Sequence, residues 1–241
     1  MNHCRYSEAR FYSDQTMDIY QYSPLVGPHT IRVLQLHGGS DRLQCSIRHE
    51  SVFEAHFSAL SYAWGQSEKP FSIEVVGDSG EPLGSIPLTA NLNHALHDLA
   101  SSDGIPEAHF WIDQICINQD DIPERGSQVA LMSSIYQLAE RVVTYIGPQE
   151  PGDTEALALL MRIHRHFEPY YYDELAIDQI TKTLSDATLR EKLRFDPEPS
   201  GPAWRALRDM SNGDWAWRVW MVQENLLNRN TVMLRGVRVL P

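Results

Sequence analysis

The chain has 241 residues, 42% of them hydrophobic, so it is long enough to bury one substantial core and we expect one domain. Its formal net charge is −12, and no cluster of lysine or arginine is interleaved with aromatic residues, which argues against nucleic acid as a partner. Three cysteines without C-x-x-C spacing and no long apolar stretch argue against a disulfide framework, a zinc site and a membrane partner, and we expect a cytoplasmic protein.

The N-terminal part of the chain predicts a lead-in, a set of short strands and a helix. Residues 1–28 are polar and rich in tyrosine, and they predict a flexible lead-in to a folded domain at residues 29–241. Thr89 is expected to cap a helix at about 89–100, after a loop at 77–82. Four strands are expected before this helix, of which the first two form an N-terminal β-hairpin: residues 31–36, 43–48, 57–62 and 71–76.

The middle of the chain predicts a strand, a helix and a second strand. A brief strand at 110–113 is followed by a loop, and Asp121 and Glu124 then have capping-box spacing at the start of a long helix. The expected buried face of this helix consists of Val129, Met132, Tyr136 and Ala139. The next strand, at 142–146, completes a unit that implies a parallel crossover. We therefore expect an α/β fold with a mostly parallel sheet flanked by helices.

The C-terminal part predicts an insertion followed by the end of the sheet. Residues 149–213 are expected to form a helical insertion with two helices, at about 153–168 and 173–194. A stretch rich in proline, glycine and serine at 197–202 ends the second of these helices. A closing strand is expected at 231–240.

Glu224 is the most informative single residue. At 3.6 residues per turn it completes one face of a helix whose other members are Trp217, Trp220 and Met221. An acid in an aromatic stripe is shielded from water, and its charge is then available to a ligand in an adjoining pocket. The alternative is that Glu224 lies at the edge of the stripe and pairs with Arg218 or Arg229.

Polar residues also follow two of the predicted strands. Ser61, Tyr62, Trp64 and Gly65 come at the end of one strand, and Asp113, Asn118 and Gln119 come after another. The C-terminal ends of parallel strands meet at one rim of a sheet, where ligands commonly bind. The alternative is structural, because Asp113 can cap a turn and Asn118 can hold an Asx-turn.

Other candidate sites are weaker. Cys116 lies between Ile115 and Ile117, where a small buried residue is more common than a nucleophile, and we expect the cysteines to be reduced and not essential. His164 and His166 are two positions apart on a predicted helix and face different sides, so no metal site is predicted.

Three blocks of the sequence, in order, resemble the heterokaryon-incompatibility (HET) domain of filamentous fungi. They are Ala59 to Gly65 with Asn91-Leu92 and Ala95-Leu96, Trp111 to Gln119 continuing through Glu124-Arg125, Gln128-Val129, Met132, Ile135-Tyr136, Ala139 and Gly147, and Arg218 to Glu224 ending near Gly236. Together the blocks cover about residues 20–240. Gln114 departs from the pattern, because the family usually has a smaller residue there, and residues 149–213 have no counterpart.

The resemblance implies a role in fungal nonself recognition, a form of innate immunity, in which the HET domain is an effector of programmed cell death controlled by a regulatory domain or partner protein. HET domains are also thought to be distantly similar to TIR domains, which have a flavodoxin-like α/β fold. In enzymatic TIR domains a glutamate on a helix, close to a tryptophan, cleaves the nicotinamide glycosidic bond of NAD. Glu224 and Trp220 resemble that pair, and Ser61-Tyr62 resembles the loop after the first strand.

Two functions remain open from the sequence. The first is a glycohydrolase for NAD or a related nucleotide, with Glu224 as the catalytic residue and neither a metal nor a cofactor. The residues expected to bind its substrate are Ser61, Tyr62, Trp64, Gly65, Asp113, Asn118, Arg218 and Trp220. The second is a non-enzymatic module that triggers cell death by self-association. An acid within a tryptophan stripe favours the enzyme, because a binding surface gives no reason for that placement.

Overall fold

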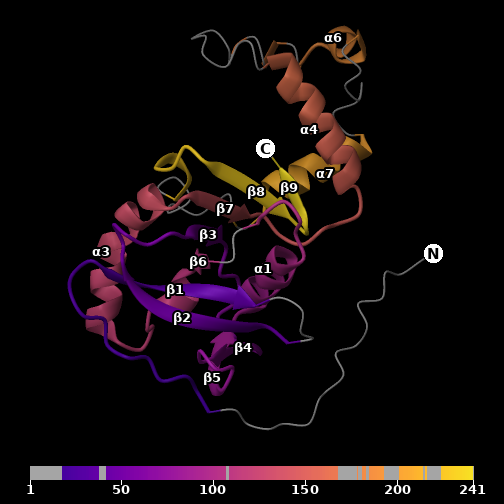
Figure 1. Ribbon diagram of the computed structural model, residues 1–241. Helices are drawn as coiled ribbons and strands as arrows, with labels where there is room; N and C mark the ends of the chain where they lie inside the picture. Colours follow the sequence, from indigo (N-terminus) through magenta and orange to yellow (C-terminus); the bar gives the residue numbers. More distant parts are fainter. Residues whose placement is uncertain are drawn as a thin grey trace.

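A computed structural model describes most of the chain and shows a sheet flanked by helices (Figure 1). The residues described are 18–37, 42–106, 109–167, 178, 181–182, 185–192, 201–213, 215 and 224–240. Among them, the strands form one nine-stranded sheet with the order β5-β4-β2-β1-β6-β3-β7-β8-β9. The strands are β1 Thr30–His37, β2 Gln44–Ser51, β3 Ser58–Tyr62, β4 Phe71–Val76, β5 Pro82–Leu88, β6 His109–Trp111, β7 Arg141–Tyr145, β8 Thr231–Arg235 and β9 Arg238–Leu240.

The pairing of the strands is mixed. The central strands β6, β3, β7 and β8 run parallel to one another, and β2 is parallel to β4. The pairs β1–β2, β1–β6, β4–β5 and β8–β9 are antiparallel. The expected α/β fold and the N-terminal hairpin are confirmed. The helices are α1 Ala90–Ala100, α2 Asp113–Cys116, α3 Ile122–Leu138, α4 Asp153–Phe167, α6 Ala187–Lys192 and α7 Pro202–Ser211.

The two long helices next to the sheet begin where their capping residues predict. The Thr89 side chain accepts a hydrogen bond from the backbone of Leu92 at the start of α1, and the Asp121 side chain accepts one from Glu124 at the start of α3. The predicted buried face of α3 is partly wrong, because Val129 is 42% exposed. Gln128 occupies the buried position instead, and its amide donates to the carbonyl of Thr30 at 3.0 Å.

Three further elements differ from the sequence prediction. The expected loop at 77–82 ends at Pro82, where β5 begins as the antiparallel partner of β4. The single strand expected at 231–240 is two antiparallel strands, because Gly236, with φ +54°, turns the chain between β8 and β9. Helix α7 starts with Pro202 in its first turn, in the stretch where the sequence predicted the end of a helix.

Helices α1 and α3 cover opposite faces of the central strands. Side chains alternate along a strand, so neighbouring residues of β7 point to opposite sides of the sheet. The Tyr145 hydroxyl donates to Asp98 of α1 at 2.7 Å, whereas Trp111 of β6 packs edge-to-face on Tyr136 of α3, with 5.7 Å between ring centroids. Trp111 shares its face of the sheet with Ala59, its paired residue in β3. We call the sheet side covered by α3 the α3 face.

The start of the described chain is fastened to the sheet. Tyr20 donates through its backbone N–H to the carbonyl of Ser85 at 2.9 Å, and Ser85 donates in turn to Asp18 at 2.9 Å. Tyr22 is joined to α2, because its hydroxyl donates to the carbonyl of Ile115 at 2.8 Å. Of the lead-in expected at residues 1–28, the described part from residue 18 onward thus carries specific contacts with the domain.

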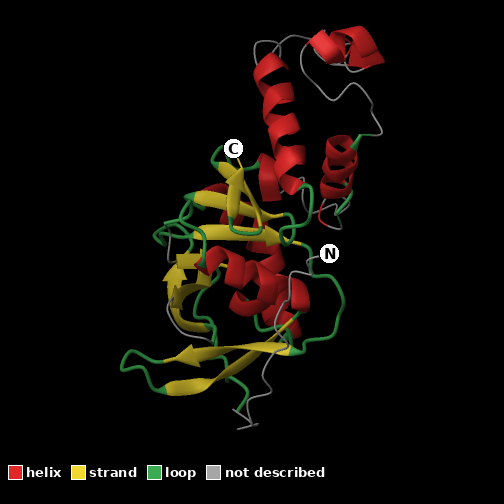
Figure 2. Cartoon of the chain, turned by 90° about the vertical axis from the view of Figure 1, so that its right-hand side faces the viewer, coloured by secondary structure: helices red, strands yellow, loops and turns green. Residues whose placement is uncertain are grey.

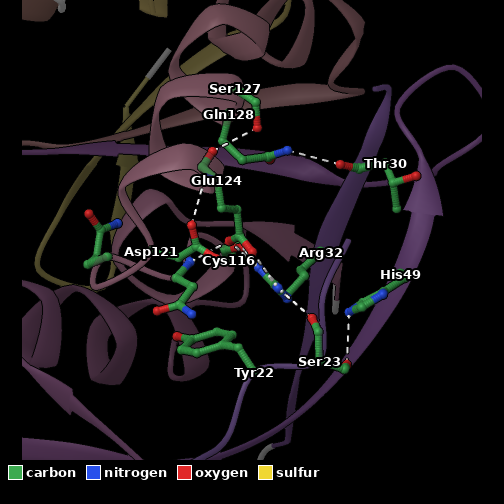
Figure 3. A network of polar contacts seen from close by, with 12 residues as sticks. Tyr22, Ser23, Thr30, Arg32, His49, Cys116, Asp121, Glu124, Ser127 and Gln128 are labelled. Carbon is green, nitrogen blue, oxygen red and sulfur yellow. Dashed lines mark hydrogen bonds and ion pairs between the residues drawn. The ribbon is translucent and has the colours of Figure 1, made fainter. Parts of the chain in front are cut away.

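A buried arginine ties this segment to the start of α3 (Figure 3). Arg32, 0% exposed, makes two hydrogen bonds to the Glu124 carboxylate, at 2.6 and 2.9 Å. The same guanidinium donates to the carbonyls of Ser23 and Cys116 and lies over the ring of Tyr22. The Glu124 carboxylate therefore binds Arg32 and, among the contacts of the described residues, accepts no hydrogen bond from the backbone N–H of Asp121. Only the Asp121 half of the predicted capping box is formed.

Helices α4 and α7, which fall in the expected insertion, lie beyond the β8 and β9 edge of the sheet (Figure 2). Leu159 of α4 is fully buried against Trp204 and Leu207 of α7, among other residues, so the two helices form a small core of their own. A buried ion pair joins this unit to the sheet, because Arg235 of β8 lies 2.8 Å from Asp153 at the start of α4. The helix expected at 153–168 is confirmed, and most of the one expected at 173–194 falls outside the described residues.

Candidate functional site

Glu224 is buried and held by polar contacts. Its side chain is 1% exposed, and the Ser61 hydroxyl donates to Glu224 Oε2 at 2.5 Å. Ser61 in turn accepts a hydrogen bond of 3.1 Å from the indole N–H of Trp215. We call Ser61, Trp215 and Glu224 the Glu224 cluster. It joins the C-terminal end of β3 to two segments more than 150 residues away, since its two hydrogen bonds span 163 and 154 positions.

The register of the sheet explains how Glu224 is placed. Ser61 of β3 is paired with Thr144 of β7, and paired residues of parallel strands project from the same face. The Thr144 hydroxyl donates to Asn225 Oδ1 at 2.5 Å, directly beside the bond from Ser61 to Glu224. Two neighbouring hydroxyls on the α3 face thus hold two consecutive residues of the chain.

The segment after Glu224 is also fastened to α3. The Asn228 amide donates to the carbonyl of Tyr136 at 3.0 Å and to that of Ala139 at 2.6 Å, at the C-terminal end of the helix. Free carbonyls at a helix end are commonly satisfied in this way. The segment that carries Glu224 is therefore fixed to the sheet and to the C-terminal end of α3.

A second set of polar contacts lies at the loop after β3. The Trp64 indole N–H donates to Asp113 Oδ2 at 2.7 Å, which ties this loop to the start of α2. Asn91 of α1 donates to the carbonyl of Ala63 at 3.2 Å. Gly65 has φ +70°, and a Cβ there would lie 2.7 Å from Asn91 Nδ2, so a side chain would strain the backbone and displace Asn91. We call Trp64, Gly65, Asn91 and Asp113 the Trp64 cluster.

The loop between α2 and α3 is closed by its own side chains. Asn118 Oδ1 accepts from the backbone N–H of Asp120 at 3.2 Å, which is the Asx-turn considered from the sequence. Gln119 donates to the carbonyl of Asp113 at 2.8 Å, and the N–H of Asn118 donates to Glu124 at 2.7 Å. Burial works to raise the pKa of Glu124, but its bonds from Arg32 and Asn118 outweigh burial and hold this pKa below its usual value.

The structure places the predicted site residues in different surroundings. Ser61 and Glu224 are in direct contact, and Trp64 is in direct contact with Asp113. Tyr62 is 2% exposed and follows Ser61 on its strand, so its side chain leaves the opposite face of the sheet. That Trp64 and Asp113 share a pocket with Glu224 stays a prediction.

The remaining predicted residues are Gly65, which is exposed, and Asn118, Arg218 and Trp220. Asn118 lines a pocket of about 330 Å³ together with residues of the lead-in and β5. Arg218 and Trp220 lie outside the described residues, as do Trp217 and Met221 of the stripe. In the described part of the chain, no group of three or more His, Cys, Asp and Glu side chains is placed to hold a metal ion, and no helix is long and apolar enough to cross a bilayer.

Three residues that hold the chain around these clusters, Trp215, Thr144 and Arg32, were not predicted from the sequence. Trp215 and Thr144 carry no local signal, because their partners lie far away in sequence. Arg32 did carry one. A charged residue in the apolar run from Ile31 to Leu34 of a central strand must be paired if it is buried.

The described cysteines are free buried thiols. Burial raises the pKa of Cys116 to about 12 and also raises the pKa of Cys45. Cys116 Sγ accepts from the backbone N–H of Ile112 at 3.3 Å, so it packs against the residue that precedes α2. Neither thiol is in a disulfide, which agrees with the expected reduced state, and that no cysteine is essential stays a prediction. Cys4 falls outside the described residues.

Comparison with known proteins agrees with the three sequence blocks. A family model described as "Heterokaryon incompatibility protein (HET)" matches residues 57–224, which is more than half of the chain. The chain is 30% identical, over 248 residues, to heterokaryon incompatibility protein 6, OR allele, of Neurospora crassa. That alignment covers 92% of this chain and 35% of the relative, so the chain spans about a third of the relative's length. No solved structure matches the chain. The chain belongs to the heterokaryon incompatibility (HET) family.

Proposed function

We propose that this chain is a cell-death effector of fungal nonself recognition and that it acts by hydrolysing NAD or a related nucleotide at Glu224. The name of the Neurospora crassa relative supports the role in heterokaryon incompatibility. The observation that carries the chemistry is the Ser61 hydroxyl bond to Glu224 at 2.5 Å within a buried site. A carboxylate fixed in this way is oriented before any substrate arrives, which is the condition for strong electrostatic stabilisation.

The reaction needs one negative charge at a fixed place. The bond between ribose C1′ and the nicotinamide nitrogen breaks, and its electron pair goes to the ring nitrogen, which loses its positive charge. Glu224 stabilises the cation that develops at the ribose, as carboxylates do in glycoside hydrolysis. Water then bonds to C1′ and gives up a proton to solvent, so the products are ADP-ribose, nicotinamide and a proton.

Access to the carboxylate requires a movement of the protein. Glu224 is 1% exposed in this structure, so NAD reaches it only when the segments that cover it separate. We propose that clustering of the domain favours the open arrangement, because association that prefers a sparsely populated state raises its population. The isolated chain is then nearly inactive, and the clustered chain hydrolyses NAD.

The Trp64 cluster has a positioning role in this proposal. Trp64 and Asp113 hold the loop after β3 against α2, and Asn91 holds the same loop against α1. Ser61 lies three positions before Trp64, so this loop determines where β3 ends and how its hydroxyl is presented. Loss of these contacts displaces Ser61 without removing the charge of Glu224.

The burial of Glu224 also favours a second candidate. In this alternative Glu224 only anchors residues 224–230 to the sheet, and the domain triggers cell death by non-enzymatic self-association. Glu224→Gln distinguishes the two, because glutamine keeps an acceptor for Ser61 but removes the charge.

The test compares Glu224→Gln with Glu155→Gln, which makes the same change at an exposed position of α4. Each protein is fused to an inducible oligomerising module, and melting temperature, NAD consumption and cell death are measured. We expect Glu224→Gln to lower turnover by roughly two to four orders of magnitude while the protein remains folded. A folded Glu224→Gln protein that consumes NAD and kills cells like Glu155→Gln would falsify the proposed chemistry. Cell death without NAD consumption in the parent protein would support the second candidate.

A further inference from the structure

A pocket of about 330 Å³ lies between the N-terminal segment, β5 and the loop after α2. Its lining includes Tyr20 and Tyr22 from the first of these segments and Gln114 from α2. Ser61 and Glu224 are not among the lining residues, so this pocket is separate from the proposed reaction site.

One wall of the pocket is a built feature of the fold. Residues 18–20 pair with Ser85 of β5 through two backbone hydrogen bonds of 2.9 Å. Gly84 makes this approach possible. It has φ +130°, and a Cβ there would lie 2.8 Å from the carbonyl oxygen of Asp18 and from the backbone of Tyr20. A side chain at position 84 would push the wall away.

The second wall is held by Tyr22 and its partners. The Tyr22 hydroxyl donates to the carbonyl of Ile115, and the Arg32 guanidinium lies 4.8 Å from the centre of the Tyr22 ring. Tyr20 packs edge-to-face on Tyr22, with 5.0 Å between ring centroids. The Tyr22 ring is thus held in place before a ligand binds, and the half-buried Tyr20 packs against it.

Gln114 supplies an unused polar group. Its side chain is 1% exposed, and its Oε1 accepts from the backbone N–H of Thr89 at 3.0 Å. Because a backbone N–H can only donate, this bond fixes which end of the amide is the oxygen. The amide nitrogen, with two N–H donors, has no hydrogen-bond partner among the described residues. A buried donor without an acceptor is unfavourable, so a ligand that supplies one is favoured.

The charges of the pocket indicate an uncharged ligand. Its charged lining residues are Lys69 and Asp120, whose opposite charges balance. Its volume is at the lower end of small-molecule sites. Tyrosine rings provide stacking surfaces for planar heterocycles, and amide donors pair with their carbonyl oxygens or ring nitrogens.

We propose that this pocket binds an uncharged planar heterocycle of the nucleobase or nucleoside kind. The Gln114 amide donates to an acceptor on the ring, and Tyr20 contacts the face of the ring. Because the Gln114 amide nitrogen is covered in this structure, entry requires a side chain of the wall to turn aside. Tyr20 is half-buried and Gln21 is exposed, so both can move more easily than the buried Gln114.

The experiment measures binding of adenosine to the full chain by calorimetry and by saturation-transfer NMR. Tyr20→Leu removes the ring and keeps apolar volume, so we expect about tenfold weaker binding. Tyr20→Phe keeps the ring and should bind within about twofold of the parent. Gln114→Glu keeps the acceptor for Thr89 but replaces the donors by an oxygen, and it should weaken binding by about tenfold or more.

Further variants test the class of ligand and the independence of the site. Lys69→Gln and Asp120→Asn should each change adenosine affinity by less than about twofold, because the ligand is uncharged. Glu224→Gln should bind adenosine like the parent, which separates this site from the proposed reaction. If Gln114→Glu does not fold, the comparison of Tyr20→Leu with Tyr20→Phe tests the proposal in its place.

Three results would overturn the proposal. The first is no saturable binding of adenosine to the parent protein at concentrations up to about 10 mM. The second is equal binding by Tyr20→Leu and Tyr20→Phe. The third is adenosine monophosphate binding more than about tenfold tighter than adenosine, which would show a site for an anion.

Discussion

The Glu224 cluster and the Trp64 cluster lie at the same end of β3 but differ in burial and in what they contact. Ser61 and Glu224 are almost fully buried, and their bond joins two side chains. The Trp64 cluster is partly exposed and includes contacts with backbone as well as side-chain atoms. Residues of one family motif can therefore serve separate purposes. One cluster fixes an acidic side chain inside the protein, and the other fixes the course of a loop.

The largest stability change is expected at Gly65. Gly65→Ala places a Cβ 2.7 Å from Asn91 Nδ2 at φ +70°, so it should lower the free energy of unfolding by about 2 to 4 kcal/mol. Gly80→Ala is the matched control, since Gly80 has φ +80° with nothing within 4 Å of the added Cβ. It should cost about 1 to 2 kcal/mol. Equal losses in chemical denaturation would show that the contact with Asn91 is unimportant.

Ser61→Ala tests the other cluster. It leaves the Glu224 carboxylate and the Trp215 indole each without one partner, so we expect a loss of about 1 to 3 kcal/mol. Ser58→Ala changes a buried hydroxyl on the same strand that has no hydrogen-bond partner among the described residues, and it should be nearly neutral. Chemical denaturation of both variants measures the difference. A Ser58→Ala variant as unstable as Ser61→Ala would mean that the loss of stability comes from lost side-chain volume and not from lost hydrogen bonds.

Asp113→Asn should have a smaller effect. Asparagine keeps an oxygen that can accept from the Trp64 indole, but that bond loses its charge assistance. We expect a loss of about 1 kcal/mol in the free energy of unfolding. Retention of full stability would show that the charge of Asp113 is not needed to hold the loop, and the substrate-binding role considered from the sequence would gain support.

Acid should weaken the contacts that hold the loop between α2 and α3, because protonation of Glu124 weakens its bonds from Arg32 and Asn118. The pKa of Glu124 is held below its usual value of 4.5 in the folded protein, so its stabilising contribution is complete above about that pH and is lost as pH falls through the lower folded value. We expect the protection factors of amides near Asn118, corrected for the intrinsic exchange rate, to fall as the pH drops below 4.5 and Glu124 becomes protonated. Glu124→Gln should remove this pH dependence, and an unchanged profile would contradict the role of the ion pair with Arg32.

Local chemistry allowed much of the fold to be predicted. Thr89 and Asp121 cap their helices as expected, because a capping side chain acts on residues two or three positions away. The sequence failed where a choice depended on distant partners. Val129 and Gln128 are neighbours on α3. Gln128 is the buried one, because its amide donates to the carbonyl of Thr30 in the sheet. β5 was missed because it pairs with β4 and with residues 18–20.

The candidate site could be predicted only in part. The aromatic stripe predicted that Glu224 is buried, and it is. Its contact with Ser61 depends on the register of β3 and β7, which no local pattern specifies. Trp215 was missed because its single contact in the cluster lies across the fold. The structural alternative for Asn118 is confirmed, because its Asx-turn is present.

The central claim is that Glu224 carries the chemistry and the Trp64 cluster carries only position. The most direct measurement is the rate of nicotinamide release from NAD, per folded molecule, by the clustered protein and by its Glu224→Gln and Asp113→Asn variants. The account predicts a loss of roughly two to four orders of magnitude for Glu224→Gln and a change within about threefold for Asp113→Asn. Full activity in folded Glu224→Gln, with activity lost in folded Asp113→Asn, would contradict it.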